Sequence, residues 1–153
     1  NKKILNQSPV KSITFKKEIV VLNICSTVEL TAGEFFRRIF ESFDKNDIAF
    51  DLINISETHI SVTLNKNTDL SELTEEFKLF SVVKIERNKS QISVIGSNIK
   101  NTNGIESKIL NELREINISL ISHGASKMNF SFVIERKDLE PSIRKLHRYF
   151  FED

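Results

Sequence analysis

The strongest constraint on the fold of this chain is an internal repeat with an offset of about 70 residues. A stripe of apolar residues that contains Ile39 and Phe43 aligns with Ile109 and Leu113. Further on, the alternating stretch 60–62 aligns with 130–132. Two copies of one supersecondary unit predict two small domains that share a framework.

The first copy reads in the order strand, helix, strand, strand, helix, strand. Thr31 and Glu34 have the spacing of a capping box, and phenylalanines then recur at helical spacing. Apolar and alternating runs indicate the strands. We predict strands over 20–24, 49–55, 59–64 and 82–86 and helices over 32–46 and 70–80. This order is that of a ferredoxin-like, split βαβ unit, so the fold class is α+β.

The second copy lacks a last strand. Its elements are predicted over 91–95, 104–115, 119–122, 129–135 and 137–150. A spare strand, 10–15, precedes the first copy, and we expect it to fill the sheet edge that would otherwise stay unpaired. The first unit would then be inserted in the second. The predicted domains are 18–88, and 10–17 together with 89–153.

The composition of the chain argues against several classes of protein. The chain has 22 Lys+Arg against 21 Asp+Glu, so it offers no broad basic surface for nucleic acid or anionic membrane. No apolar run approaches the roughly 20 residues of a spanning helix. The single cysteine, Cys25, suits a reducing compartment, and we expect a cytoplasmic protein with Cys25 in the core. Because the chain opens with Asn1 rather than Met, we expect a fragment of a longer protein.

Three motifs resemble a known family. The stretches 51–65 (DLINISETHISVTLN), 121–134 (ISHGASKMNFSFVI) and 145–152 (KLHRYFFE) are similar to the C-terminal regulatory region of aspartokinases, most of all the lysine-sensitive monofunctional kind. The resemblance implies tandem ACT domains that sense an amino acid for feedback inhibition and are not themselves catalytic. The kinase domain would precede Asn1. ATP and Mg²⁺ are expected only there, and no cofactor or metal is expected in this chain.

The resemblance also implies an effector site on the first unit, closed by the first unit of a partner chain in a homodimer. Lysine is the expected effector and threonine the second candidate. One side of the site is the loop that opens the first helix, and the other is the start of the second strand. The implied residues are Glu29, Ala32, Glu34, Phe35, Phe36, Phe50, Asp51, Ser56 and Glu57. A helix start attracts the carboxylate of an amino acid, and Asp51 suits its ammonium group.

Several of these residues also have a structural explanation. Glu34 fits a capping box, and Ser56 and Glu57 fit a hairpin turn. Glu29, Ala32 and Glu34 depart from the family's usual residues, so the site could be retuned or lost. A structural dimerisation module with a pocket that binds nothing is therefore a second hypothesis.

Other function classes have little support. The sequence around Phe130 and Phe132 resembles the aromatic strand of RNA-recognition domains, but it lacks the leading basic residue and glycine. No Gly-rich phosphate loop or nucleophile elbow indicates an independent enzyme. His59, His123 and His147 do not have the spacing of metal ligands.

Overall fold

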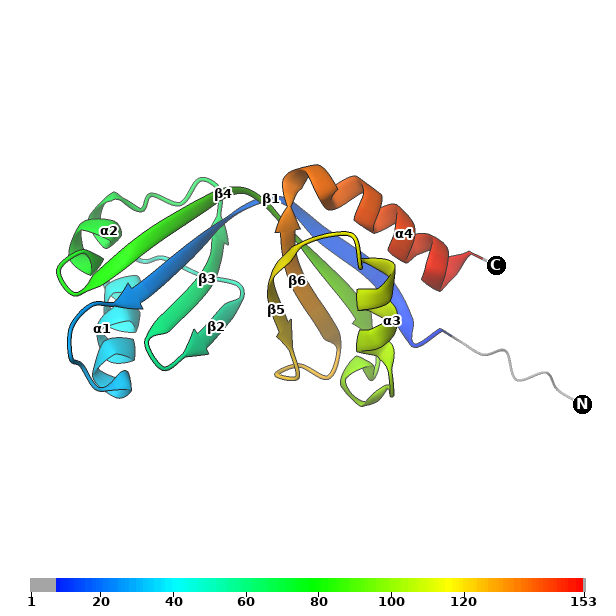
Figure 1. Ribbon diagram of the computed structural model, residues 1–153, viewed down its shortest axis with the longest axis horizontal. Helices are drawn as coiled ribbons and strands as arrows, with labels where there is room; N and C mark the ends of the chain where they lie inside the picture. Colours follow the sequence, from blue (N-terminus) through cyan, green and yellow to red (C-terminus); the bar gives the residue numbers. More distant parts are fainter. Residues whose placement is uncertain (1–7, 153) are drawn as a thin grey trace, which may run out of the picture. The chain divides into compact units, whose positions relative to one another are not determined.

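The computed structural model describes residues 8–152. Its helices and strands follow one another in the order that the repeat predicts (Figure 1). They are β1 (Val10–Ser26), α1 (Ala32–Lys45), β2 (Ile53–Ser56), β3 (His59–Asn65), α2 (Ser71–Phe77), β4 (Ser81–Gly96), α3 (Ile105–Glu112), β5 (Ile118–His123), β6 (Asn129–Glu135) and α4 (Leu139–Phe151), with 3₁₀ turns at Ile99–Asn101 and Arg136–Asp138. The strands follow the order β2-β3-β1-β4-β6-β5. No helix in the described part is long and apolar enough to cross a membrane.

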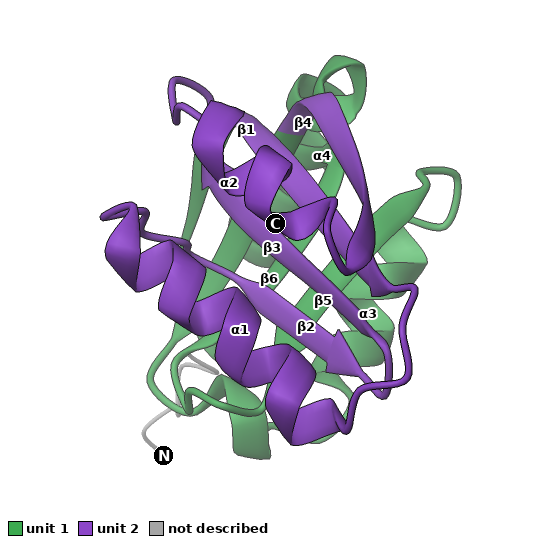
Figure 2. Cartoon of the chain, turned by 90° about the vertical axis from the view of Figure 1, so that its left-hand side faces the viewer, with its two compact units in different colours: residues 1–17, 90–153 green, residues 18–89 purple. Residues whose placement is uncertain are grey.

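The chain divides into two compact units (Figure 2). The inserted unit, Glu18–Lys89, is purple in Figure 2 and holds the first copy of the repeat. The outer unit, green, comprises the chain up to Lys17 and from Ser90 onward. Each unit is a ferredoxin-like arrangement, which confirms the α+β fold class.

The spare N-terminal strand completes the second sheet, as predicted. It is the first half of β1, and it lies beside the second half of β4. Val10 is buried in the same core as Ile92 and Val94. The hydroxyl of Ser90 donates to the carbonyl of Lys17 at 2.5 Å. At the strand's end, a Cβ on Gly96 would lie 2.0 Å from the Pro9 carbonyl oxygen, so only glycine permits this approach.

The sequence suggested separate strands where the structure has long ones. Residues 10–15 and 20–24 are parts of the single strand β1, and residues 82–86 and 91–95 are parts of β4 (Figure 1). The charged residues between these parts stay extended. β4 contains one irregular point, Asn88 at φ 57°, a left-handed conformation that asparagine tolerates better than most residues. It lies close to the border between the units.

Equivalent positions form the two cores. Figure 2 shows α1 and α2 in front of the strands of the inserted unit. Each fully buried side chain contributes roughly 1.5–3 kcal/mol relative to exposure. On α1 of the inserted unit, Phe35, Ile39 and Phe43 are buried, and their counterparts in the outer unit are Ile105 and Ile109 on α3 and Leu113 at its C-terminal cap. On the strands, Ile60, Val62 and Leu64 correspond to Phe130, Phe132 and Ile134, all buried. The core residues therefore follow the 70-residue offset found in the sequence.

Candidate functional site

The start of α1 has an open first turn. The side-chain oxygen of Thr31 accepts a hydrogen bond from the Glu34 N–H at 3.2 Å, which is the first half of the predicted capping box. Ala32 and Gly33 are exposed, and nothing lies within 4 Å of a Cβ placed on Gly33. The first N–H groups of a helix have no acceptor within it. Such a turn can receive a carboxylate through its N–H groups and the helix dipole.

Glu34 does not complete the capping box. Its carboxylate instead binds the Arg38 guanidinium, one turn further along α1, at 2.8 Å. Both side chains are partly exposed, at 39% for Glu34 and 42% for Arg38. The Arg38 partner reduces the repulsion that Glu34 would exert on an incoming carboxylate.

The two phenylalanines of the predicted site differ in exposure. Phe35 is 1% exposed and belongs to the hydrophobic core, so its side chain faces away from solvent. Its N–H donates to the Thr31 carbonyl at 3.0 Å. Phe36 is partly buried, with its ring centroid 5.8 Å from that of Phe35. Phe35 therefore supports the start of α1 rather than lining an open surface.

The β2–β3 turn lies beside the end of β1. Ser56 and Glu57 are both exposed there. The N–H of Ser26 donates to the Thr58 carbonyl at 2.9 Å, and Cys25 pairs with His59. The turn is thus held next to the segment that carries Glu29 towards α1. Cys25 is half-buried at this end of the strand, so the expectation of a core cysteine is wrong.

Phe50 and Asp51 lie at the opposite end of β2. Phe50 packs against Phe43, in the last turns of α1, with ring centroids 5.4 Å apart. The Asp51 N–H donates to the Thr63 carbonyl at 3.0 Å. Along β3, Thr63 lies four residues from His59, about 13 Å at the usual rise of a strand. One unit therefore brings Ser56 and Glu57 towards the start of α1 and leaves Phe50 and Asp51 distant from it.

A polar chain crosses the sheet of the inserted unit. The Ser61 hydroxyl donates to Asn23 at 2.5 Å, and the Asn23 amide donates to the Glu86 carboxylate at 2.8 Å. Burial opposes ionisation of Glu86, but the Asn23 hydrogen bond and the Lys84 side chain outweigh it, so the pKa of Glu86 is lowered. The sequence reading missed this network. The residue that could have indicated this network is Asn23, a polar residue within the apolar run of β1.

The histidines take part in local pairs. Imidazole nitrogens of His123 and His147 lie 2.9 and 3.1 Å from carboxylate oxygens of Glu106 and Glu152. His59 lies 2.9 Å from the Thr58 hydroxyl. Within residues 8–152, no three His, Cys, Asp or Glu side chains gather as metal ligands would.

Comparison with known proteins identifies the architecture. Residues 92–150 match the ACT domain family. The chain is 32% identical to "Aspartokinase 2, chloroplastic" of Arabidopsis thaliana over 97% of its own length, and it covers 29% of that relative. It thus spans less than a third of that protein.

Two solved structures have the same fold. A putative C-terminal regulatory domain of aspartate kinase from Porphyromonas gingivalis aligns over 94% of this chain and 99% of that one, with a TM-score of 0.83 and 24% identity. Aspartokinase III of Escherichia coli, in complex with lysine and aspartate, aligns over 98% of this chain and 35% of that one, with a TM-score of 0.83 and 25% identity. Residues 92–150 therefore match the ACT domain family, and the chain as a whole is similar in sequence to part of an aspartokinase and shares the fold of both solved structures.

Proposed function

We propose that this chain senses lysine for an aspartate kinase and inhibits the kinase when lysine is abundant. The observation that carries the proposal is the open first turn of α1, which can receive the carboxylate of an amino acid. The structure of the Escherichia coli relative in complex with lysine and aspartate makes lysine the first effector to test. Threonine is the second candidate. ATP and Mg²⁺ would belong to the kinase domain of the parent protein, for which we propose a cytoplasmic location.

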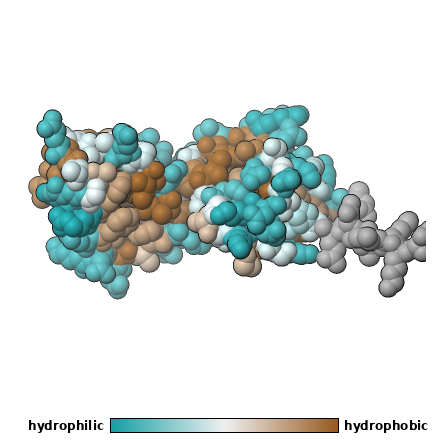
Figure 3. Space-filling model, turned by 90° about the horizontal axis from the view of Figure 1, so that it is seen from below, coloured by the Kyte–Doolittle hydropathy of each residue, from teal (hydrophilic) through white to brown (hydrophobic). Residues whose placement is uncertain are grey.

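A homodimer would bring the two groups of site residues together. β2 is an edge strand, with Ile55 45% exposed on it, and Figure 3 shows apolar side chains (brown) at the surface of the inserted unit on its left. An edge strand invites pairing with another chain. If two β2 strands pair antiparallel across a two-fold axis, the beginning of one lies beside the end of the other. Asp51 of one chain would then approach the partner's turn at Ser56 and Glu57.

In this arrangement the first turn of α1 binds the lysine carboxylate. Asp51 accepts hydrogen bonds from an ammonium group, a charge-assisted interaction. Lysine would bind one arrangement of the dimer better than the other. A difference of about 1–3 kcal/mol is typical of such coupling and would shift the attached kinase towards its inactive state.

Titration of the chain with lysine tests the proposal. A ligand at about 100 times its dissociation constant stabilises the folded state by roughly 2.7 kcal/mol, enough to raise the melting midpoint by several degrees. Asp51→Ala should remove most of the lysine shift, whereas the control Asp44→Ala, an exposed aspartate on α1, should keep it. Sedimentation should show a dimer.

The alternatives give different results. If threonine raises the midpoint and lysine does not, the module senses threonine. If neither amino acid has an effect, the chain is a structural dimerisation module. A chain that remains monomeric at high concentration with lysine present would contradict the proposed pairing of the β2 strands.

A further inference from the structure

A hollow in the outer unit lies between the end of α3 and the second half of α4. Its volume is about 280 Å³. Pockets for drug-sized ligands begin at about 300 Å³, so this one suits a small metabolite. It is lined only by polar residues: Asn111, Glu112, Arg114, Glu115, Lys145 and Arg148. None of them belongs to the effector site proposed above.

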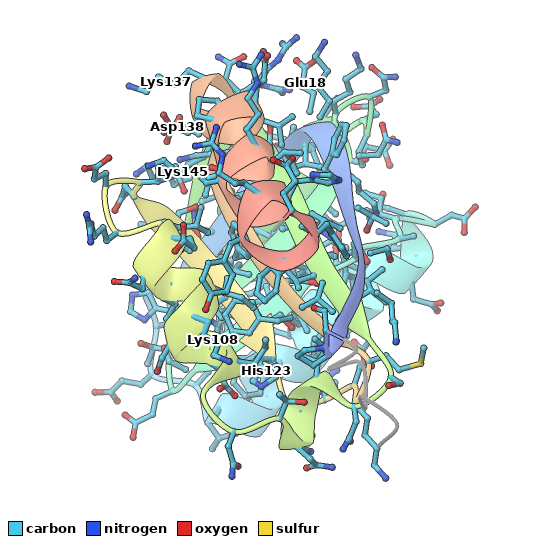
Figure 4. All side chains as sticks on the ribbon, turned by 90° about the vertical axis from the view of Figure 1, so that its right-hand side faces the viewer. Glu18, Lys108, His123, Lys137, Asp138 and Lys145 are labelled. Atoms are coloured by element: carbon cyan, nitrogen blue, oxygen red, sulfur yellow. The ribbon has the colours of Figure 1, made fainter. Side chains whose placement is uncertain are left out.

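The charged side chains that line the hollow form only one ion pair with one another in the described part of the chain. The ammonium of Lys145 lies 3.2 Å from the carboxylate of Glu115. Figure 4 shows Lys145 on the side of α4 turned towards the segment that follows α3. In the described part of the chain, the side chains of Arg114, Arg148 and Glu112 have no ion pair. The hollow therefore presents two guanidinium groups and one carboxylate that are not neutralised by a neighbour.

We infer that this hollow binds an acidic α-amino acid, of the class of aspartate and glutamate. Such a molecule carries two carboxylates and one ammonium group, the complement of two guanidinium groups and one carboxylate. A guanidinium group binds a carboxylate through two parallel hydrogen bonds. Glu112 accepts from the ammonium group, and the Asn111 carboxamide offers both a donor and an acceptor.

Other ligand charges fit less well. A phosphate dianion would be attracted by the arginines, but Glu112 and Glu115 line the same hollow and would repel it. Lysine has two ammonium groups and a single carboxylate, so it would leave one guanidinium group without a partner. The site is open to solvent, and exposed ion pairs are weak, so binding should occur at millimolar concentrations.

Helix dipoles offer a simpler explanation for the arginines. Arg148 lies in the last turn of α4, and Arg114 follows the end of α3. Cations at helix C-termini are stabilising without any ligand. If this explanation is complete, added anions will only screen the charges of the arginines without binding at a defined place. A titration distinguishes such screening from a binding site.

The test is an NMR titration of the whole chain with aspartate and with succinate at constant ionic strength. Succinate has both carboxylates but lacks the ammonium group. We expect saturable shifts of the amides of 111–115 and 145–148 with aspartate, and weaker binding of succinate by about tenfold, the value of one charged hydrogen bond. Arg148→Gln should abolish saturation. Glu112→Gln should remove the preference for aspartate over succinate.

Arg144→Gln is the matched control. Arg144 lies on the same helix, pairs with Glu140 and does not line this hollow, so its replacement should leave aspartate binding unchanged. Shifts that fail to saturate, or that persist in Arg148→Gln, would show that the arginines are merely solvated. Because the hollow lies in the outer unit, a failure of lysine to bind the inserted unit does not affect this result.

Discussion

The two units share a framework but differ where their first helices begin. In the inserted unit, α1 begins after a threonine cap, and its first turn is open. In the outer unit, α3 begins one turn later in the repeat, after a 3₁₀ turn, and its cap residue Gly104 has a φ of 74° and no side-chain hydrogen bond. Glu106, in the first turn of α3, already binds His123 at 2.9 Å. The two cores are alike and the two helix starts differ, so we expect the lysine carboxylate to bind at the start of α1 and not at the start of α3.

The difference also extends to the sheets. Asn23 and Ser61 form a hydrogen bond in the inserted unit, and Ser93 and Ser131, at the same positions of the repeat, lie 2.7 Å apart in the outer unit. Only the inserted unit continues this contact to a carboxylate, that of Glu86. The cross-strand contact is thus between neutral side chains in both units, and in the inserted unit Asn23 also donates a charge-assisted hydrogen bond to a carboxylate.

The largest effects should come from the equivalent core isoleucines of the two first helices. Ile39→Ala and Ile109→Ala each empty a fully buried position, which typically costs about 2–5 kcal/mol. Far-UV circular dichroism follows both units, whereas fluorescence of the single tyrosine, Tyr149 on α4, follows the outer one. Because β1 and β4 run through both units, we expect Ile39→Ala to shift both signals in urea. A tyrosine transition that Ile39→Ala leaves unmoved would show that the units unfold independently.

A smaller effect should separate the two helix starts. Thr31→Ala removes a side-chain cap and should cost about 1 kcal/mol. Gly104→Ala meets no atom within 4 Å, so its cost of a similar size comes only from the positive φ. Lysine affinity should fall in Thr31→Ala and stay constant in Gly104→Ala, as measured by calorimetry. Equal affinities in the two variants would remove the start of α1 from the site.

Sequence patterns predicted helix α1 to within one residue at its end, because its cap and its stripe of phenylalanines are local signals. The same patterns predicted that the second strand begins at residue 49, whereas β2 begins at Ile53. Phe50 packs on α1 instead, and Leu52 pairs irregularly with Thr63: the Leu52 N–H donates to the Thr63 hydroxyl, and the Leu52 carbonyl accepts from the Thr63 N–H. The distance of Asp51 from the start of α1 follows from strand register, which is a non-local property. No motif in the sequence encodes it.

The hydrogen bond from Asn23 to the Glu86 carboxylate predicts a pH dependence that is confined to the inserted unit. The folded-state pKa of Glu86 is lowered, so its stabilisation is present above the unfolded value of about 4.3 and is lost as the pH falls through the lower folded value. Glu86→Gln should cost about 1 kcal/mol at pH 7, and the difference from the unmodified chain should shrink below about pH 4. Ser93→Ala, in the outer unit, should give a difference that does not vary with pH. Urea unfolding at several pH values measures both.

The smallest effect on stability should come from removing the Glu106 carboxylate from the first turn of α3. Glu106 is 39% exposed, so replacing it in Glu106→Gln should change the free energy of unfolding by less than about 1 kcal/mol. Without the carboxylate, His123 loses its Glu106 carboxylate partner but still packs against Phe130, with ring centroids 5.1 Å apart. Gly104 still begins the helix without a side-chain cap. The outer unit has no counterpart of Asp51: Ile121 lies opposite Phe132 as Ile53 lies opposite Val62, so Ser119 takes the position of Asp51. We therefore expect calorimetry to give one lysine per chain both before and after the substitution. If the Glu106→Gln variant binds a second lysine, then the His123–Glu106 pair alone prevents lysine from binding to the outer unit.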